Sequence, residues 1–149
     1  MTEFFDDEIL EMAVAREVDA NRFYLILAAR VQDDDLRKIF EILADEELEH
    51  KAKLELEIMK TGRTVGANGT PKGLRDIKPD YMLPEFSMDF KDMLLIAMQK
   101  EDAAFRFYMD LAGMATDADS KEMLLELARE ETGHKERFQT VYEHLFKEA

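Results

Sequence analysis

One acidic pattern occurs twice along this chain, at the same spacing in each half. Glu17 is followed thirty positions later by Glu47, and Glu47 is followed three positions later by His50. Residues three apart on a helix point to the same face, so Glu-x-x-His offers a carboxylate oxygen and an imidazole nitrogen to one point. The same three residue types recur 84 positions further along, as Glu101, Glu131 and His134.

Two such sets provide four carboxylates and two imidazoles, which is the ligand set of di-iron and di-manganese helical bundles. Carboxylate and imidazole ligands suit iron, manganese or, less often, zinc. An ionised carboxylate that is buried without a partner costs several kcal/mol, whereas a domain has only about 5–15 kcal/mol of net stability. We therefore favour bound metal ions over a metal-free core, in which the glutamates would be protonated or would pair with Arg22 and Arg106.

Apolar residues repeat at three- and four-residue steps in four segments, which predicts four helices with all six residues on their buried stripes. Ser87 is the expected N-cap of the third helix, and one of the aspartates at 33–35 is expected to cap the second. Short connections make two helical hairpins, and residues 62–86, which hold all three prolines, form a long crossover rather than an interdomain linker. We expect one all-α domain over residues 1–149, a four-helix bundle with helices at about 5–31, 36–60, 88–115 and 121–146.

The two halves share more than the six residues. Arg-Phe-Tyr at 22–24 recurs at 106–108, which indicates an internal duplication and an approximate two-fold axis between the two metal positions. Tyr24 and Tyr108 lie seven residues after the single glutamate of each half and share its helix face. Each is either a core aromatic residue or a catalytic group that hydrogen-bonds a ligand carboxylate and passes protons.

Two further glutamates, Glu46 and Glu130, precede the Glu-x-x-His pairs directly. They are either spare carboxylates or solvated residues, and we favour the solvated interpretation. The net charge of −14 argues against a nucleic-acid partner or an anionic membrane. The absence of cysteine excludes disulfides, zinc–thiolate sites and iron–sulfur clusters. No signal peptide and no membrane-spanning run is visible, so we expect a cytoplasmic protein.

At these residues the sequence resembles the rubrerythrin group of the ferritin-like superfamily, over nearly the whole chain. The resemblance implies a ferritin-like bundle with a non-haem di-iron centre, two iron ions or alternatively manganese, that reacts with peroxide or oxygen. It also implies a homodimer, with Glu47 and Glu131 as the bridging ligands. The implied metal ligands are Glu17, Glu47, His50, Glu101, Glu131 and His134.

The chain departs from the family pattern in two ways. It has no cysteine for a rubredoxin-type iron, so electrons must come from an external donor. Rubrerythrins also tend to carry a further glutamate one turn after the single glutamate of the third helix, where this chain has Ala104. The leading hypothesis is a di-iron oxidoreductase that reduces hydrogen peroxide or oxygen. The alternatives are an iron-binding or storage protein and a helical module with structural metal ions.

Overall fold

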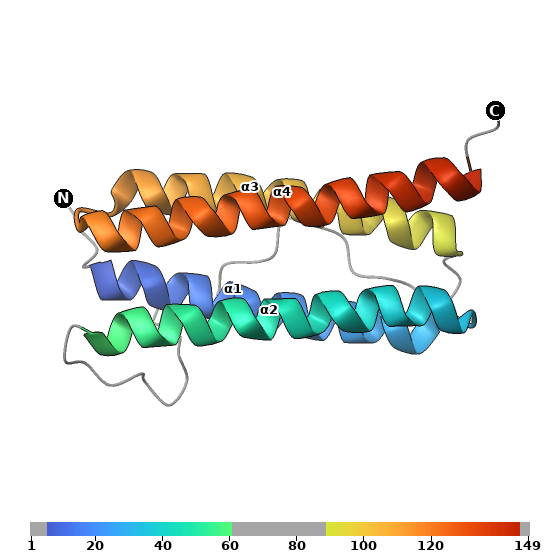
Figure 1. The fold of residues 1–149 in the computed structure, drawn as a ribbon, viewed down its shortest axis with the longest axis horizontal. Helices are drawn as coiled ribbons and strands as arrows, with labels where there is room; N and C mark the ends of the chain where they lie inside the picture. Colours follow the sequence, from blue (N-terminus) through green and yellow to red (C-terminus); the bar gives the residue numbers. More distant parts are fainter. Residues whose placement is uncertain (1–5, 61–88, 147–149) are drawn as a thin grey trace.

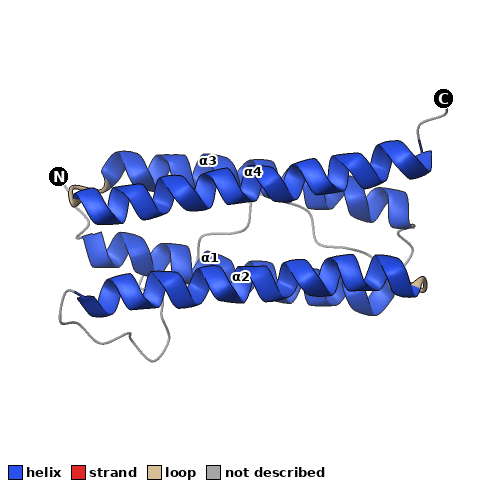
Figure 2. Ribbon diagram, viewed as in Figure 1, coloured by secondary structure: helices blue, strands red, loops and turns tan. Residues whose placement is uncertain are grey.

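The computed structural model describes residues 6–60 and 89–146, where all regular structure is helical (Figure 2). The first three helices begin and end close to the predicted positions, and the fourth begins at Ala118 rather than near residue 121. The crossover predicted at 62–86 lies outside the described residues. The helices are α1 (Asp6–Arg30), α2 (Asp34–Lys60), α3 (Phe90–Met114) and α4 (Ala118–Phe146).

Aspartates cap three of these helices. The carboxylate of Asp33 accepts hydrogen bonds of 2.9 and 3.1 Å from two backbone N–H groups in the first turn of α2, which confirms the predicted cap. Asp89 caps α3 by accepting a 2.9 Å bond from the N–H of Asp92, and Asp117 caps α4 in the same way. The prediction that Ser87 caps α3 was wrong, because Asp89 immediately precedes the first helical residue; Ser87 itself is not among the described residues.

The helices form two hairpins, as predicted. α1 packs closely along α2 and α3 packs closely along α4, while α1 faces α3 and α2 faces α4 across the bundle (Figure 1). The second hairpin repeats the first, because the bounds of α3 follow those of α1 by 84 positions at both ends. This places the two copies of the acidic pattern at the same height in the bundle.

The interior has two apolar clusters. One contains Phe40 and Phe138, which are fully buried, and the other contains Leu54 and Leu127. The four glutamates and two histidines of the repeated pattern come from the middle of the helices, between these clusters. Apolar packing on both sides therefore encloses a polar layer.

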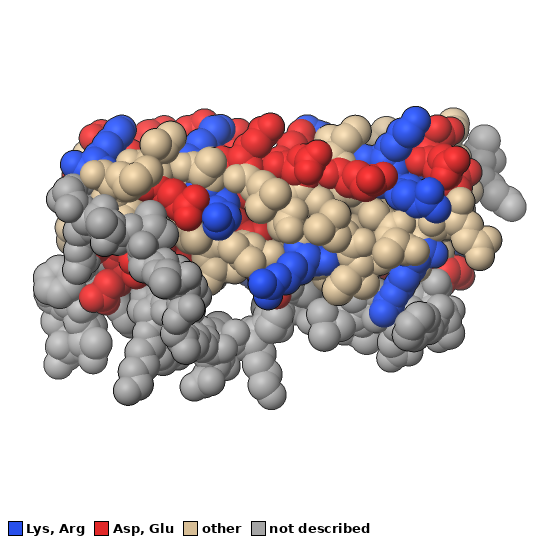
Figure 3. All heavy atoms as spheres, turned by 90° about the horizontal axis from the view of Figure 1, so that it is seen from below, with Lys and Arg blue, Asp and Glu red and all other residues tan. Residues whose placement is uncertain are grey.

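The surface is strongly charged. Seen from below, acidic and basic side chains are interspersed over the bundle (Figure 3). None of the helices in the described ranges combines the length and the apolar character that crossing a membrane requires.

Candidate metal centre

The structure brings all six predicted residues together inside the bundle. The four glutamates are fully buried, and the two histidines are nearly so. The ligand atoms of Glu47, His50 and His134 lie within 4.8 Å of one another, and so do those of two overlapping groups of four residues. We call these groups the N-half position and the C-half position. The N-half position comprises Glu17, Glu47, His50 and Glu131, and the C-half position comprises Glu47, Glu101, Glu131 and His134.

Two glutamates, Glu47 and Glu131, belong to both positions. A carboxylate has two oxygens and can bind two cations at once. These are the residues that the sequence analysis expected to bridge the metal ions. They come from α2 and α4, so one bridge is contributed by each hairpin.

The unsatisfied atoms of this cluster test whether a metal pair fits. Each of the six residues has one buried oxygen or nitrogen that makes no hydrogen bond in the described part of the structure. Leaving a buried polar group unsatisfied costs about 1–3 kcal/mol, and cations bound among these atoms would remove that cost. Oxygen and nitrogen donors of this kind match the preferences of iron and manganese. The residues therefore fit a di-metal centre.

Burial and neighbouring charges shift the pKa values of three of the four glutamates, two upward and one downward. Burial, together with repulsion from Glu17 and Glu131, raises the pKa of Glu47 well above its usual range. Burial and the Glu131 carboxylate raise the pKa of Glu101 to about 7. Burial raises the pKa of Glu131 too, but the Arg16 guanidinium and hydrogen-bonding neighbours lower it well below its usual range. Cations at the two positions would take the place of the protons on the glutamates whose pKa is raised.

Both imidazoles present Nδ1 to the carboxylates. The Nδ1 atom of His50 lies 3.2 Å from Glu47 Oε1, and that of His134 lies 3.5 Å from Glu131 Oε2. Burial lowers the pKa of His50, but the neighbouring carboxylates, Glu131 foremost, raise it to about 12. Burial likewise lowers the pKa of His134, and the carboxylates of Glu101 and Glu131 raise it to about 10. The two rings stack nearly parallel, with centroids 5.8 Å apart.

The other nitrogen of each imidazole faces a glutamate of the opposite hairpin. His50 Nε2 lies 2.7 Å from Glu130 Oε2, and His134 Nε2 lies 3.0 Å from Glu46 Oε2. Glu46 and Glu130 are partly exposed, so the preferred solvated interpretation holds only in part, because each carboxylate also contacts a histidine. A carboxylate at this place orients a ligand histidine and raises its basicity.

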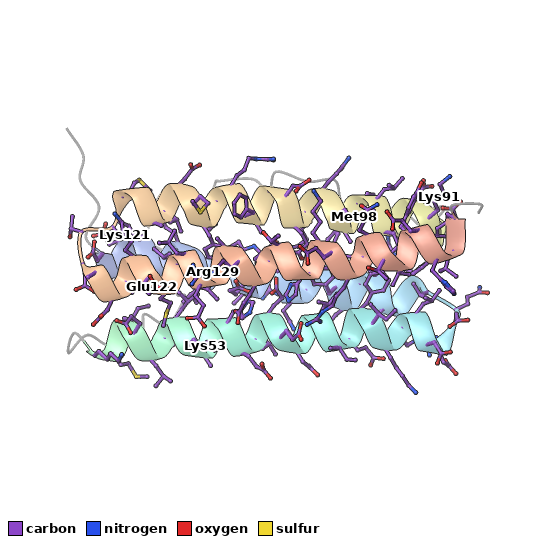
Figure 4. The ribbon with its side chains drawn as sticks, turned by 45° about the horizontal axis from the view of Figure 1, so that its top comes forward. Lys53, Lys91, Met98, Lys121, Glu122 and Arg129 are labelled. Carbon is purple, nitrogen blue, oxygen red and sulfur yellow. The ribbon has the colours of Figure 1, made fainter. Side chains whose placement is uncertain are left out.

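Surface cations hold these two supporting carboxylates. Arg137 donates two hydrogen bonds, of 2.9 and 3.1 Å, to Glu46. Lys53, which extends from α2 (Figure 4), has its Nζ 3.7 Å from Glu130 Oε1. The pairing with Glu46 is thus the tighter of the two.

The tyrosines cross between hairpins in the same reciprocal way. The hydroxyl of Tyr24 donates a hydrogen bond to Glu101, and that of Tyr108 donates one to Glu17. Both tyrosines are fully buried. The sequence left open whether each tyrosine is a core aromatic residue or a group that hydrogen-bonds a ligand carboxylate, and the structure favours the second. Each tyrosine reaches the glutamate of the opposite hairpin, which fits the expected two-fold relation.

One cation in the cluster was not anticipated. Arg16 forms ion pairs with Glu17, Glu47 and Glu131, whereas the sequence analysis had named Arg22 and Arg106 as the alternative partners. Arg22 is exposed on α1. A signal was present, because a basic residue precedes the single glutamate in both halves, Arg16 before Glu17 and a lysine before Glu101.

Known proteins resemble this chain in sequence and in fold. The sequence model of the family described as Rubrerythrin matches residues 8–142. A hypothetical protein from Pyrococcus furiosus is 29% identical, with a TM-score of 0.73 over 94% of this chain and 89% of that chain. KatB, a manganese catalase from Anabaena PCC7120, shares the fold at 15% identity, with a TM-score of 0.69 over 97% of this chain and 75% of that chain. No curated protein matches the chain.

Proposed function

Because the chain belongs to the rubrerythrin family, we propose that its buried cluster binds two iron ions and that the loaded protein reduces hydrogen peroxide or oxygen to water. The observation that carries the proposal is the pair of overlapping ligand sets that share Glu47 and Glu131. A surface cation site or a single structural metal would not need two bridging carboxylates inside an apolar core. The buried, unsatisfied ligand atoms support the same conclusion.

The chain's own residues divide the work of the site. The residues of the two positions would hold two cations, and two ferrous ions there would supply the two electrons that, with two protons, convert one peroxide to two waters. Tyr24 and Tyr108 hold protons against Glu101 and Glu17, where they can be passed to an oxygen of the bound oxidant. The apolar clusters on either side limit the access of water to the layer.

The partners follow from the same proposal. The chain holds no cysteine to bind a rubredoxin-type iron, so a separate protein or a small reductant would return the electrons. A homodimer is the assembly that the family resemblance favours. Light scattering on the purified protein measures the assembly directly.

Anaerobic iron loading followed by stopped-flow mixing with hydrogen peroxide tests the reaction. We expect a near-ultraviolet absorbance increase within seconds and the consumption of one peroxide for every two ferrous ions oxidised. Glu131→Ala should abolish the signal because both positions lose a ligand. Glu49→Ala, a matched change of an exposed glutamate on α2, should leave it intact. The absence of any absorbance change over several minutes in the unmodified protein would contradict the proposal.

Ala104 favours a second candidate, namely iron binding and oxidation without repeated turnover. It is almost fully buried one turn after Glu101, where the family tends to place a further carboxylate. Repeated additions of peroxide and a reductant separate the candidates, since a storage protein would oxidise its iron once and then stop. Manganese should be loaded in parallel, because KatB is a manganese catalase of the same fold. Oxygen release from peroxide without a reductant would then identify disproportionation.

A further inference from the structure

The guanidinium of Arg16 lies among the oxygens of one metal position and not equally between the two. Its Nη1 atom lies 3.2 Å from Glu17 Oε1, 2.9 Å from Glu47 Oε2 and 3.1 Å from Glu131 Oε1. Those three carboxylates and His50 are the ligands of the N-half position. The side chain of Arg16 is only 13% exposed, so water screens these ion pairs weakly.

The oxygens of two of the three carboxylates place Arg16 on the His50 side. Glu131 turns Oε1 toward His50, at 3.3 Å from Nδ1, and Oε2 toward His134, at 3.5 Å. Arg16 binds Oε1. It also binds Glu17 Oε1, the oxygen that lies 3.6 Å from His50 Nδ1. Glu47 is less one-sided, because Arg16 binds its Oε2 while its Oε1 lies 3.2 Å from His50 Nδ1 and 3.6 Å from His134 Nδ1. A cation in the N-half position would compete with the guanidinium for the Glu17 and Glu131 oxygens that it already uses.

The other half of the chain has a different arrangement. Lys100 occupies the place that corresponds to Arg16, and its charge lowers the pKa of Glu101, which burial raises. Its Nζ lies over the rings of Phe23 and Tyr24, 5.6 and 5.3 Å from their centroids. Arg16, in contrast, lies over the ring of Tyr108 with its guanidinium directed at the carboxylates. The two-fold relation that the tyrosines and histidines obey is therefore broken at the residue before each single glutamate.

We propose that Arg16 is an internal cation of the N-half position, so that the C-half position loads with metal first and the N-half position loads only when the guanidinium is displaced. The guanidinium keeps its charge at all relevant pH values and binds carboxylates through directed donors. If it occupies the N-half position about nine-tenths of the time, the apparent affinity there falls about tenfold. This inference rests on metal binding at the proposed centre, and it does not require the redox reaction.

Half-site variants isolate the effect. His134→Ala removes a ligand that only the C-half position uses, and His50→Ala removes one that only the N-half position uses. Each background is combined with Arg16→Gln, and Co²⁺ binding to the metal-free protein is followed by visible absorbance against a competing chelator. We expect Arg16→Gln to tighten Co²⁺ binding about tenfold or more in the His134→Ala background and less than about threefold in the His50→Ala background.

Two further variants keep the experiment decisive. Arg22→Gln makes the same change at an exposed arginine on the same helix and should alter neither affinity. Arg16→Met retains the length of the side chain and its packing on Tyr108, and it replaces Arg16→Gln if circular dichroism shows that the glutamine variant does not fold.

Three outcomes would overturn the inference. Equal tightening in both backgrounds would mean that Arg16 acts only through its overall charge. Weaker binding in the His134→Ala background would mean that Arg16 arranges the carboxylates for the metal instead of competing with it. If the unmodified protein binds no Co²⁺ at all, the inference and the proposed function fail together, whereas the first two outcomes leave the proposed function standing.

Discussion

Removal of the Glu130 carboxylate should weaken metal binding through His50, although Glu130 is not a member of either position. His50 Nε2 lies 2.7 Å from Glu130 Oε2, a distance typical of a charge-assisted contact. Loss of such a supporting carboxylate typically reduces metal affinity by about 10–100-fold, or about 1.4–2.7 kcal/mol. The Glu130 side chain is 36% exposed, so water can replace part of its effect. We therefore expect Glu130→Ala to fall near the lower limit, about tenfold.

The corresponding change in the other half should have the larger effect. Glu46 is 27% exposed, and two hydrogen bonds from Arg137 fix it in place. A carboxylate that is already held in place loses less conformational entropy when it supports a ligand histidine. Glu46→Ala should therefore reduce metal affinity by nearly the upper limit of that range, about 100-fold. Affinities are measured by anaerobic competition against a chelator of known strength, with folding of each metal-free variant checked by circular dichroism.

Glu49→Ala is the matched control, since Glu49 is an exposed glutamate of the same helix as Glu46. A second control is the pair Glu130→Ala with His50→Ala. If Glu130 acts through the imidazole, its removal should have almost no further effect once the imidazole is gone. The reasoning is refuted if Glu130→Ala matches Glu49→Ala, or if the effects of Glu130→Ala and His50→Ala are additive.

Three further predictions concern protons, bridging and packing. The pKa of Glu101 is about 7 in the folded state against 4.5 ordinarily. Between these pH values the folded metal-free protein binds more protons than the unfolded chain. Its unfolding free energy should therefore fall by up to about 3 kcal/mol as the pH rises from 4.5 to 7. Urea denaturation should show this decline for the metal-free protein. With metal bound, the unfolding free energy should instead rise with pH, since cations bind deprotonated ligands. A metal-free protein that becomes more stable from pH 4.5 to 7 would contradict the prediction. Elemental analysis should find no metal in Glu131→Ala and one ion per chain in Glu17→Ala, and equal losses would argue against bridging. Phe138→Ala should lower the unfolding free energy by about 3–5 kcal/mol in urea, because Phe138 is fully buried, whereas Phe105→Ala, at a 39% exposed position, should cost far less.

The sequence predicted the fold because each helix carries its own periodic signal. An apolar stripe identifies the buried face from one segment alone, and the 84-residue repeat placed two such hairpins in one bundle. The same periodicity put all six glutamates and histidines on buried faces. Their convergence in space followed, because residues at the middle of four antiparallel helices share one level.

The contacts between helices could not be read from the sequence in the same way. Glu46 lies one residue before Glu47 and therefore about 100° around the helix, which looked like a solvated face. That face is in fact the boundary between α2 and α4, where His134 reaches it. Arg16 was missed for a related reason, because its long side chain bends from a half-buried position toward carboxylates on two other helices.

The reciprocity of the two hairpins has an evolutionary consequence. Two identical half-length chains paired about a dyad would carry the same side chain at both equivalent places, since any substitution would appear twice. One polypeptide that holds both halves is free of that constraint, so each half can change by itself. Arg16 and Lys100 occupy corresponding places in the two halves and have different neighbours, as this freedom allows.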